Sequence, residues 1–153
     1  VFILGDLKHG RTAHSLAKLL AHFTGVQISF CSPEGLEMPE DVLREVTAIG
    51  GENVKFNFIT SLASVIPHVD VLYVTRVQKE RFESKEIYNS FKSSYTVDSA
   101  LLERAKMDMI VMHPLPRLDE ISTDIDSDPR AAYFRQVLTA DLASSLIPIQ
   151  PQF

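Results

Sequence analysis

The sequence has little cysteine, no long hydrophobic run and no excess of positive charge. Its single cysteine, Cys31, excludes an internal disulfide and fits a reducing compartment, so we expect a cytoplasmic protein. The apolar runs, such as VDVLYV at residues 69–74, are far shorter than the ~20 residues that a membrane helix needs. A formal charge of −5 disfavours nucleic acid, which binds basic surfaces. We therefore expect neither a membrane nor a nucleic-acid partner.

The sequence also lacks internal repeats, low-complexity tracts and Gly/Ser linkers. Its 153 residues fall within the usual size of one domain. The chain starts inside an apolar segment, VFILGD, without an initiator Met, so we expect it to be part of a longer polypeptide. At the other end, residues 137–153 begin with a helical pattern, but Pro148 and Pro151 interrupt it. This divergent segment is expected to form a loose tail.

Five short apolar segments alternate with segments of helical periodicity. The expected strands are residues 1–6, 27–33, 54–59, 69–76 and 109–116, and the expected helices are residues 13–23, 39–49, 61–66, 98–105 and 129–137. Ser61, Asp98 and Asp128 are in N-cap positions, the last followed by Pro129. The alternation predicts an α/β fold, a three-layer Rossmann-like domain with a mainly parallel five-stranded sheet and helices on both faces.

Basic side chains gather at the carboxyl ends of three predicted strands, where parallel sheets bind ligands. They are Lys8, His9 and Arg11 after the first strand, Arg76, Lys79 and Arg81 after the fourth, and His113 and Arg117 after the fifth. Arginine matches carboxylates and phosphates in a bidentate way, so the cluster predicts a small anionic ligand. The alternative is that single arginines pair with surface acids.

The segment GDLKHGRT, residues 5–12, imitates a phosphate-binding loop. Gly5 and Gly10 have the required spacing, but Arg11 replaces the lysine, and neither of the predicted strands at residues 69–76 and 109–116 ends in the acid that a magnesium shell needs. Nucleotide hydrolysis is therefore disfavoured.

The acidic segment DIDSDPR, residues 124–130, imitates a calcium loop. Pro129 stands in place of the required glycine and Arg135 in place of the final glutamate, so an acidic turn that caps the next helix explains it better. The histidines lack metal-site spacing, and we predict no metal. Cys31 is expected to be a buried apolar residue.

Four segments in order, GDLKHGRTAHSL, DVLYVTRVQKER, VMHPLPRLDEI and DPRAAYFRQ, resemble the aspartate-binding domain of aspartate carbamoyltransferase. The resemblance covers residues 1–136 and is strongest to the form in animal and fungal multifunctional pyrimidine-synthesis proteins. It implies transfer of a carbamoyl group from carbamoyl phosphate to L-aspartate, without a metal or organic cofactor. The family continues beyond Gln136 into a glycine turn and a long helix, which residues 137–153 do not match.

The resemblance also implies roles for individual residues. Arg11 would hold the aspartate α-carboxylate, and Arg76 with Gln78 the side-chain carboxylate. Leu115 and Pro116 would present backbone carbonyls to the carbamoyl amide, across a peptide bond that we predict to be cis. Supporting positions are Lys8, Glu80, Arg81 and His113, with Glu80 orienting Arg76.

The rest of such a site would lie outside this chain. In the family, the carbamoyl-phosphate domain supplies the phosphate-binding and catalytic residues, and the enzyme is a homotrimer with sites at subunit interfaces. The N-terminal carbamoyl-phosphate domain is absent from this sequence, so the chain alone is expected to be inactive. Residues 83–95 correspond to a loop that closes on aspartate.

Two alternatives remain beside this interpretation. Ornithine as substrate is disfavoured, because His113 stands where the ornithine enzymes have cysteine and because the arginines suit carboxylates. A catalytically inactive remnant that binds dicarboxylates or serves assembly is the other alternative. It predicts weak dicarboxylate binding without turnover.

Overall fold

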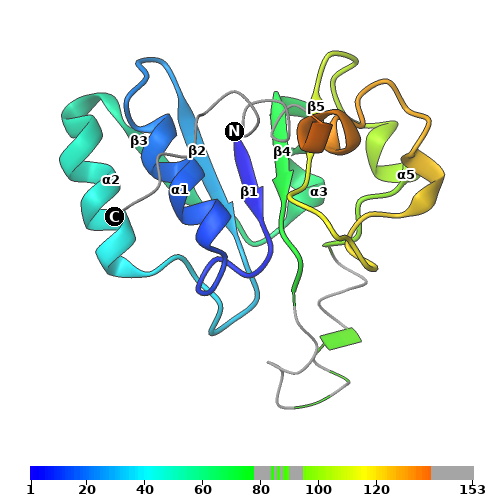
Figure 1. The fold of residues 1–153 in the computed structure, drawn as a ribbon, viewed down its shortest axis with the longest axis horizontal. Helices are drawn as coiled ribbons and strands as arrows, with labels where there is room; N and C mark the ends of the chain where they lie inside the picture. Colours follow the sequence, from blue (N-terminus) through cyan, green and yellow to red (C-terminus); the bar gives the residue numbers. More distant parts are fainter. Residues whose placement is uncertain (78–83, 85, 87, 90–94, 139–153) are drawn as a thin grey trace, which may run out of the picture.

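The computed structural model describes residues 1–77, 84, 86, 88, 89 and 95–138, and these contain a five-stranded sheet (Figure 1). The strands are β1 (Phe2–Leu4), β2 (Gln27–Cys31), β3 (Lys55–Phe58), β4 (Val71–Val74) and β5 (Ile110–Met112). They lie in the order β3-β2-β1-β4-β5, and each neighbouring pair is parallel. The chain moves outward from β1 to β3 and then returns to the other side of β1. Strand order therefore reverses between β1 and β4.

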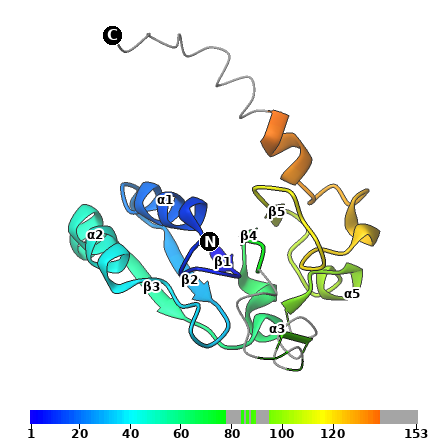
Figure 2. The same cartoon turned by 60° about the horizontal axis from the view of Figure 1, so that its bottom comes forward.

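Helices cover both faces of this sheet (Figure 2). The α-helices are α1 (Arg11–Leu20), α2 (Glu40–Gly50), α3 (Leu62–Val65) and α5 (Ser99–Leu102), with 3₁₀ turns η1 (Gly51–Asn53), η2 (Ile66–His68) and η4 (Thr123–Ile125). Residues 133–138 are also helical. In Figure 2, α1 and α2 lie on one side of the sheet and α3 and α5 on the other. The predicted three-layer α/β fold is confirmed.

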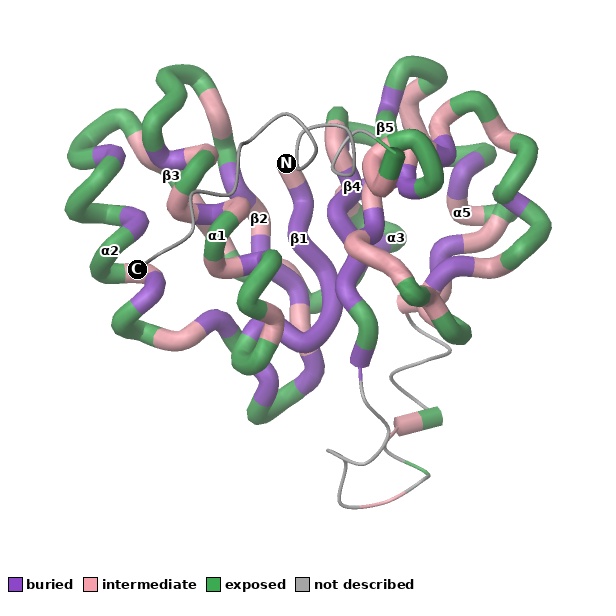
Figure 3. Tube along the Cα trace, viewed as in Figure 1, coloured by how far each residue is buried: buried purple, intermediate pink, exposed green. Residues whose placement is uncertain are grey.

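Alternation of side chains along the strands divides the core into two clusters, one for each face. In β1, Ile3 packs with α1 and α2 residues such as Ala17 and Val46. Its neighbours Phe2 and Leu4 point to the other face, where α3 and α5 contribute Leu62 and Leu102, among others. Burial on both faces is typical of central parallel strands, and β1 and β4 are buried along most of their length (Figure 3). This packing fixes the strand ends that carry the predicted site.

The last predicted helix starts later than we expected. Its predicted start at Asp128–Pro129 is wrong, because residues 129–130 form a turn and the helix covers residues 133–138. The Val111 N–H donates to the Arg130 carbonyl at 2.8 Å, and the Ala132 N–H donates to the Val111 carbonyl at 2.8 Å. These bonds form an isolated parallel bridge between Val111 and Ala131. Pairing with β5 holds this backbone extended, so the helix begins only beyond it.

Among the described residues, no helix has the length and apolar character that crossing a bilayer requires. Residues 139–153, which make up most of the predicted tail, lie outside the described residues.

Candidate active site

The carboxyl ends of β1 and β4 meet where strand order reverses, which is the usual ligand position in such a sheet. Leu4 and Val74, the last residues of the two strands, are in register. The next residue, Thr75, donates to the Leu4 carbonyl from its N–H at 2.7 Å and from its hydroxyl at 3.1 Å. Gly5 has φ +125°, and a Cβ there would lie 2.3 Å from the Thr75 carbonyl oxygen. Only glycine allows this close approach.

The loop after β1 is fixed by its own side chains. Asp6 is 4% exposed, and its carboxylate accepts the His9 backbone N–H at 3.0 Å. The same oxygen lies 3.1 Å from His9 Nδ1. On the other side, Nε2 of His14 donates to the Leu7 carbonyl at 2.6 Å and so ties the loop to α1. Arg11, the first residue of α1, is therefore presented by a loop with a defined conformation.

Three predicted site residues lie at this edge with their charges open to solvent. Lys8 and Arg11 follow β1, and Arg76 follows β4; all three are exposed. None of them forms an ion pair with another residue in the part of the chain that the structure describes. Arg11, at the start of α1, and Arg76, just beyond β4, thus follow two adjacent strands with their guanidinium groups exposed. Gln78, Glu80 and Arg81 were also predicted for the site, but they lie outside the described residues.

The loop after β5 contains the predicted cis peptide bond, between Leu115 and Pro116. Leu115 is the one residue other than glycine with positive φ in the described chain, at +48°. The left-handed conformation costs a residue with a Cβ about 1–2 kcal/mol. A hydrogen bond offsets this cost, because the Leu115 N–H donates to His113 Nδ1 at 2.8 Å.

His113 is buried, with 1% exposure, and its ring is held on both sides. Since Nδ1 accepts the Leu115 N–H, the ring proton lies on Nε2, which donates to Glu120 Oε1 at 2.8 Å. The His113 backbone N–H donates to the Gln136 side chain at 3.0 Å. His113 therefore supports Leu115 from within the protein and adds no exposed charge to the edge of the sheet.

Glu120 accepts a second hydrogen bond, from the Leu118 N–H at 3.1 Å. Burial by itself raises the pKa of this carboxyl group. The hydrogen bonds from His113 and from the backbone outweigh burial and hold the pKa below its ordinary value. Glu120 is consequently an anion in the folded protein at neutral pH.

Arg117 does not take part in an open cationic cluster, contrary to the expectation from its place after the fifth strand. Its guanidinium forms a bidentate ion pair with Asp126 and donates to the Tyr133 hydroxyl at 3.0 Å. Its Cζ also lies 5.3 Å from the centroid of the Tyr133 ring. For this arginine, the alternative of pairing with an acid is the correct one.

The acidic segment has a different structural role from the predicted helix cap. Asp124 accepts the Ser99 N–H at 3.1 Å, at the start of α5. Asp128 pairs with Arg130, whose guanidinium also donates to the Leu102 carbonyl at 2.7 Å, at the end of α5. Together with the pair of Arg117 and Asp126, these contacts fasten residues 117–130 to α5 and to the helix at 133–138.

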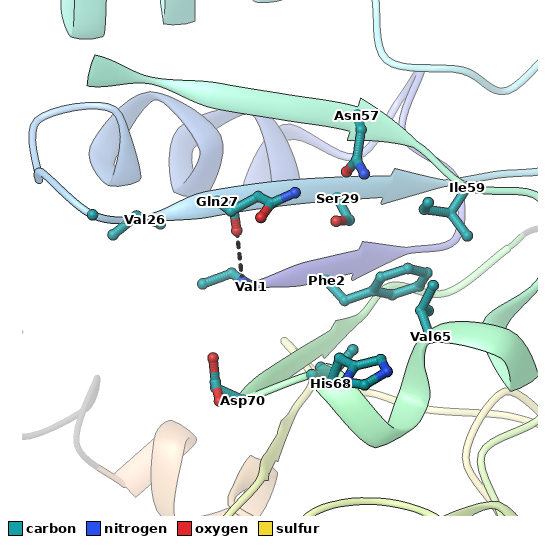
Figure 4. Close-up of a pocket in the computed structure, with 12 residues that line it drawn as sticks. Val1, Phe2, Val26, Gln27, Ser29, Asn57, Ile59, Val65, His68 and Asp70 are labelled. Atoms are coloured by element: carbon teal, nitrogen blue, oxygen red, sulfur yellow. Dashed lines mark hydrogen bonds between the residues drawn. The ribbon is translucent and has the colours of Figure 1, made fainter.

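A pocket of about 460 Å³ lies over β1, β2 and β3 on the α3 side of the sheet (Figure 4). Phe2, Ser29 and Asn57 line it from three adjacent strands, and Val65, His68 and Asp70 close it from the α3 side. The Asn57 Oδ1 atom is buried without a hydrogen-bond partner among the described residues. None of the predicted site residues lines this pocket, which is therefore separate from the candidate site.

Sequence reasoning missed four supporting residues: Asp6, His14, Glu120 and Gln136. Asp6 comes two residues after the end of a buried strand, and a carboxylate in that position is a signal that could have identified it. His14 lies one turn after Arg11 on α1, so helical spacing places it near the loop. Glu120 and Gln136 carry no such signal, because their hydrogen-bond partners depend on the conformation of the loop after β5.

Comparison with known proteins places the chain in a family. Residues 1–139 match the model of the aspartate/ornithine carbamoyltransferase Asp/Orn binding domain. The chain is 50% identical over 137 residues to multifunctional protein pyr1-3 of Dictyostelium discoideum, covering 90% of this chain and 6% of that protein. It is 48% identical over 136 residues to the aspartate carbamoyltransferase catalytic subunit of Vibrio campbellii, covering 89% of this chain and 43% of that protein.

Solved structures of aspartate transcarbamoylases place the chain in the same family. The aspartate transcarbamoylase catalytic subunit of M. jannaschii superposes with a TM-score of 0.81 at 43% identity, covering 90% of this chain and 43% of that one. The Trypanosoma cruzi aspartate transcarbamoylase in complex with carbamoyl phosphate gives 0.80 at 44% identity, covering 90% and 44%. This chain thus spans less than half the length of these relatives. It belongs to the aspartate/ornithine carbamoyltransferase family and corresponds to its Asp/Orn-binding domain.

Proposed function

We propose that this chain is the aspartate-binding half of an aspartate carbamoyltransferase, which transfers the carbamoyl group of carbamoyl phosphate to L-aspartate in de novo pyrimidine biosynthesis. The observation that carries the proposal is the position of Arg11 and Arg76. Both are exposed, in the segments that follow two adjacent strands where strand order reverses, and neither is paired with a described acid. Three of the four relatives compared above are named for aspartate, which supports aspartate over ornithine.

The two arginines suit the two carboxylates of aspartate. Arg11 would bind the α-carboxylate and Arg76 the side-chain carboxylate, each as a planar fork with two parallel hydrogen bonds. Gln78 would assist Arg76, while Lys8, Glu80 and Arg81 would support the pair from around it. Two cations would hold the ligand in one orientation, which a single arginine cannot do.

The loop after β5 would orient the other reactant. The carbonyls of Leu115 and Pro116 would accept hydrogen bonds from the carbamoyl amide, with His113 holding the loop from behind. The aspartate amine then attacks the carbamoyl carbon; a C–N bond forms, the C–O bond to phosphate breaks, and the amine loses a proton. Alignment of the two reactants is the contribution of this half to the rate.

The proposal implies partners that the chain does not contain. Phosphate binding and proton transfer would come from a carbamoyl-phosphate domain, and the assembled enzyme would be a homotrimer. No metal or organic cofactor is required for this reaction. The compartment we propose is the cytoplasm, consistent with Cys31 as the lone cysteine of the sequence.

Co-expression with a carbamoyl-phosphate-binding half tests this function. The partner half would be that of the Vibrio campbellii relative, and the product assayed would be N-carbamoyl-aspartate. We expect no turnover from either half alone and turnover from the pair, with aspartate preferred over ornithine. Assembly of the two halves without turnover would overturn the proposal and favour the inactive, dicarboxylate-binding alternative.

A further inference from the structure

A series of hydrogen-bonded side chains holds the backbone of Leu115, although none of these side chains is proposed to contact substrate. Leu115 has a positive φ, so the direction of its carbonyl depends on what fixes this conformation. The contact that does so is the N–H bond to His113 Nδ1. His113 can accept that bond only while its proton stays on Nε2.

Glu120 is the hydrogen-bond partner that keeps the His113 ring proton on Nε2. Its Oε1 accepts from His113 Nε2 at 2.8 Å and from the Leu118 N–H at 3.1 Å. One carboxylate oxygen therefore binds the protein on both sides of the Leu115–Pro116 peptide, two residues before Leu115 and two after Pro116. Hydrogen bonds to one atom, Glu120 Oε1, therefore hold both ends of the loop from His113 to Leu118.

The backbone of Glu120 is itself anchored in the core. Its carbonyl accepts the N–H of Val97 at 3.0 Å, and the Val97 carbonyl accepts the Ser122 N–H at 2.9 Å. Val97 is fully buried and pairs with Ile121 in an isolated parallel bridge. The carboxylate thus extends from a rigid segment, which is what a positioning group requires.

We propose that Glu120 is a positioning residue that acts through His113: it selects the ring tautomer that holds the Leu115 backbone and so aims the Leu115 carbonyl at the carbamoyl group. That the Leu115 carbonyl is aimed at the carbamoyl group rests on the proposed function. That Glu120 positions Leu115 through His113 rests on the contacts alone. A group that orients one reactant affects kcat, whereas aspartate binding by the arginines is left unchanged.

Glutamine and alanine at position 120 separate positioning from charge. In Glu120→Gln, the side-chain carbonyl still accepts from His113 and Leu118, so the tautomer is retained. In Glu120→Ala, both bonds are lost. Glu52→Gln, an exposed site on η1 far along the chain, is the matched control. Thermal unfolding confirms that each variant is folded before it is compared.

Two measurements test whether Glu120 positions Leu115 through His113. Imidazole ¹⁵N NMR of the chain is expected to show the Nε2–H tautomer of His113 in wild type and Glu120→Gln, and a tautomer mixture with faster Leu115 amide exchange in Glu120→Ala. In the enzyme assembled with its carbamoyl-phosphate half, Glu120→Ala is expected to lower kcat about tenfold or more, with KM for aspartate within about twofold.

Several results would overturn the proposal. They are a His113 proton on Nδ1 in wild type, a tautomer in Glu120→Ala identical to wild type, or an alanine variant that raises KM and leaves kcat intact. An assembled wild-type enzyme without turnover would contradict the proposed function instead. The NMR comparison then still decides whether Glu120 holds the loop.

Discussion

Arg117 and Asp126 form a bidentate ion pair that joins the loop after β5 to the segment before the helix at 133–138. Only 13% of the Arg117 side chain is exposed, and its guanidinium also lies against the Tyr133 and Phe134 rings. Asp126 raises the pKa of Arg117, chiefly through the hydrogen bonds between them. This arginine is a structural residue rather than a ligand-binding one.

Replacing Arg117 should therefore destabilise the fold. Arg117→Ala removes the ion pair and both ring contacts, and we expect a loss of about 2 kcal/mol in the free energy of unfolding. Arg117→Lys keeps the charge but not the bidentate geometry, and should recover only part of this. Urea denaturation measures the loss. The control is Arg44→Ala, whose side chain is 73% exposed. Equal stabilities for the two alanine variants would contradict the assignment.

The lowered pKa of Glu120 predicts a specific acid sensitivity. Its pKa lies below the ordinary value of 4.5 in the folded protein. The stability it contributes is complete above pH 4.5 and is lost as the pH falls through the lower folded value. Glu120→Gln cannot titrate, so its stability difference from wild type should shrink below pH 4.5.

Chemical denaturation of wild type and Glu120→Gln between pH 7 and pH 3 measures that difference. Asp126 and Asp128 also have lowered pKa values, through Arg117 and Arg130, but they titrate alike in both proteins and cancel. A difference that stays constant across this range would show that Glu120 does not contribute through its charge.

The contact between Gly5 and Thr75 predicts a large effect for a small substitution. A methyl group at Gly5 would meet the Thr75 backbone, so Gly5→Ala must push β1 and β4 apart at the site. We expect a loss of about 3 kcal/mol or more. Gly35→Ala is the control, because φ there is +82° but no atom lies within 4 Å. It should cost only about 1 kcal/mol. Thermal unfolding that ranks the two variants equally would refute the crowding argument.

Much of the fold was predictable because its signals are local. Strand positions, the burial of Cys31 and the start of α2 after Pro39 follow from apolar runs and breakers within a few residues. The cis peptide at Pro116 was predicted from the family resemblance and is confirmed. Arg117 was interpreted wrongly because its partner Asp126 is nine residues away, across a turn that periodicity does not describe.

The late start of the last helix has a similar cause. Asp128 and Pro129 match a helix-cap pattern, but the Asp128 carboxylate is used by Arg130, and the backbone at Ala131 pairs with β5. Tertiary contacts thus outweigh a local signal. The same holds for the contact between His113 and Glu120, which links two positions seven residues apart through the shape of the loop.

We propose that Arg11 and Arg76 together bind a dicarboxylate at the reversal between β1 and β4. Calorimetric titration of the chain with succinate tests it most directly. We predict binding by wild type and by Arg44→Ala, with affinity reduced about tenfold or more in Arg11→Ala and in Arg76→Ala, each of which loses a charge-assisted contact. Folded wild-type protein that fails to bind succinate, or binding unaffected by both substitutions, would contradict the account.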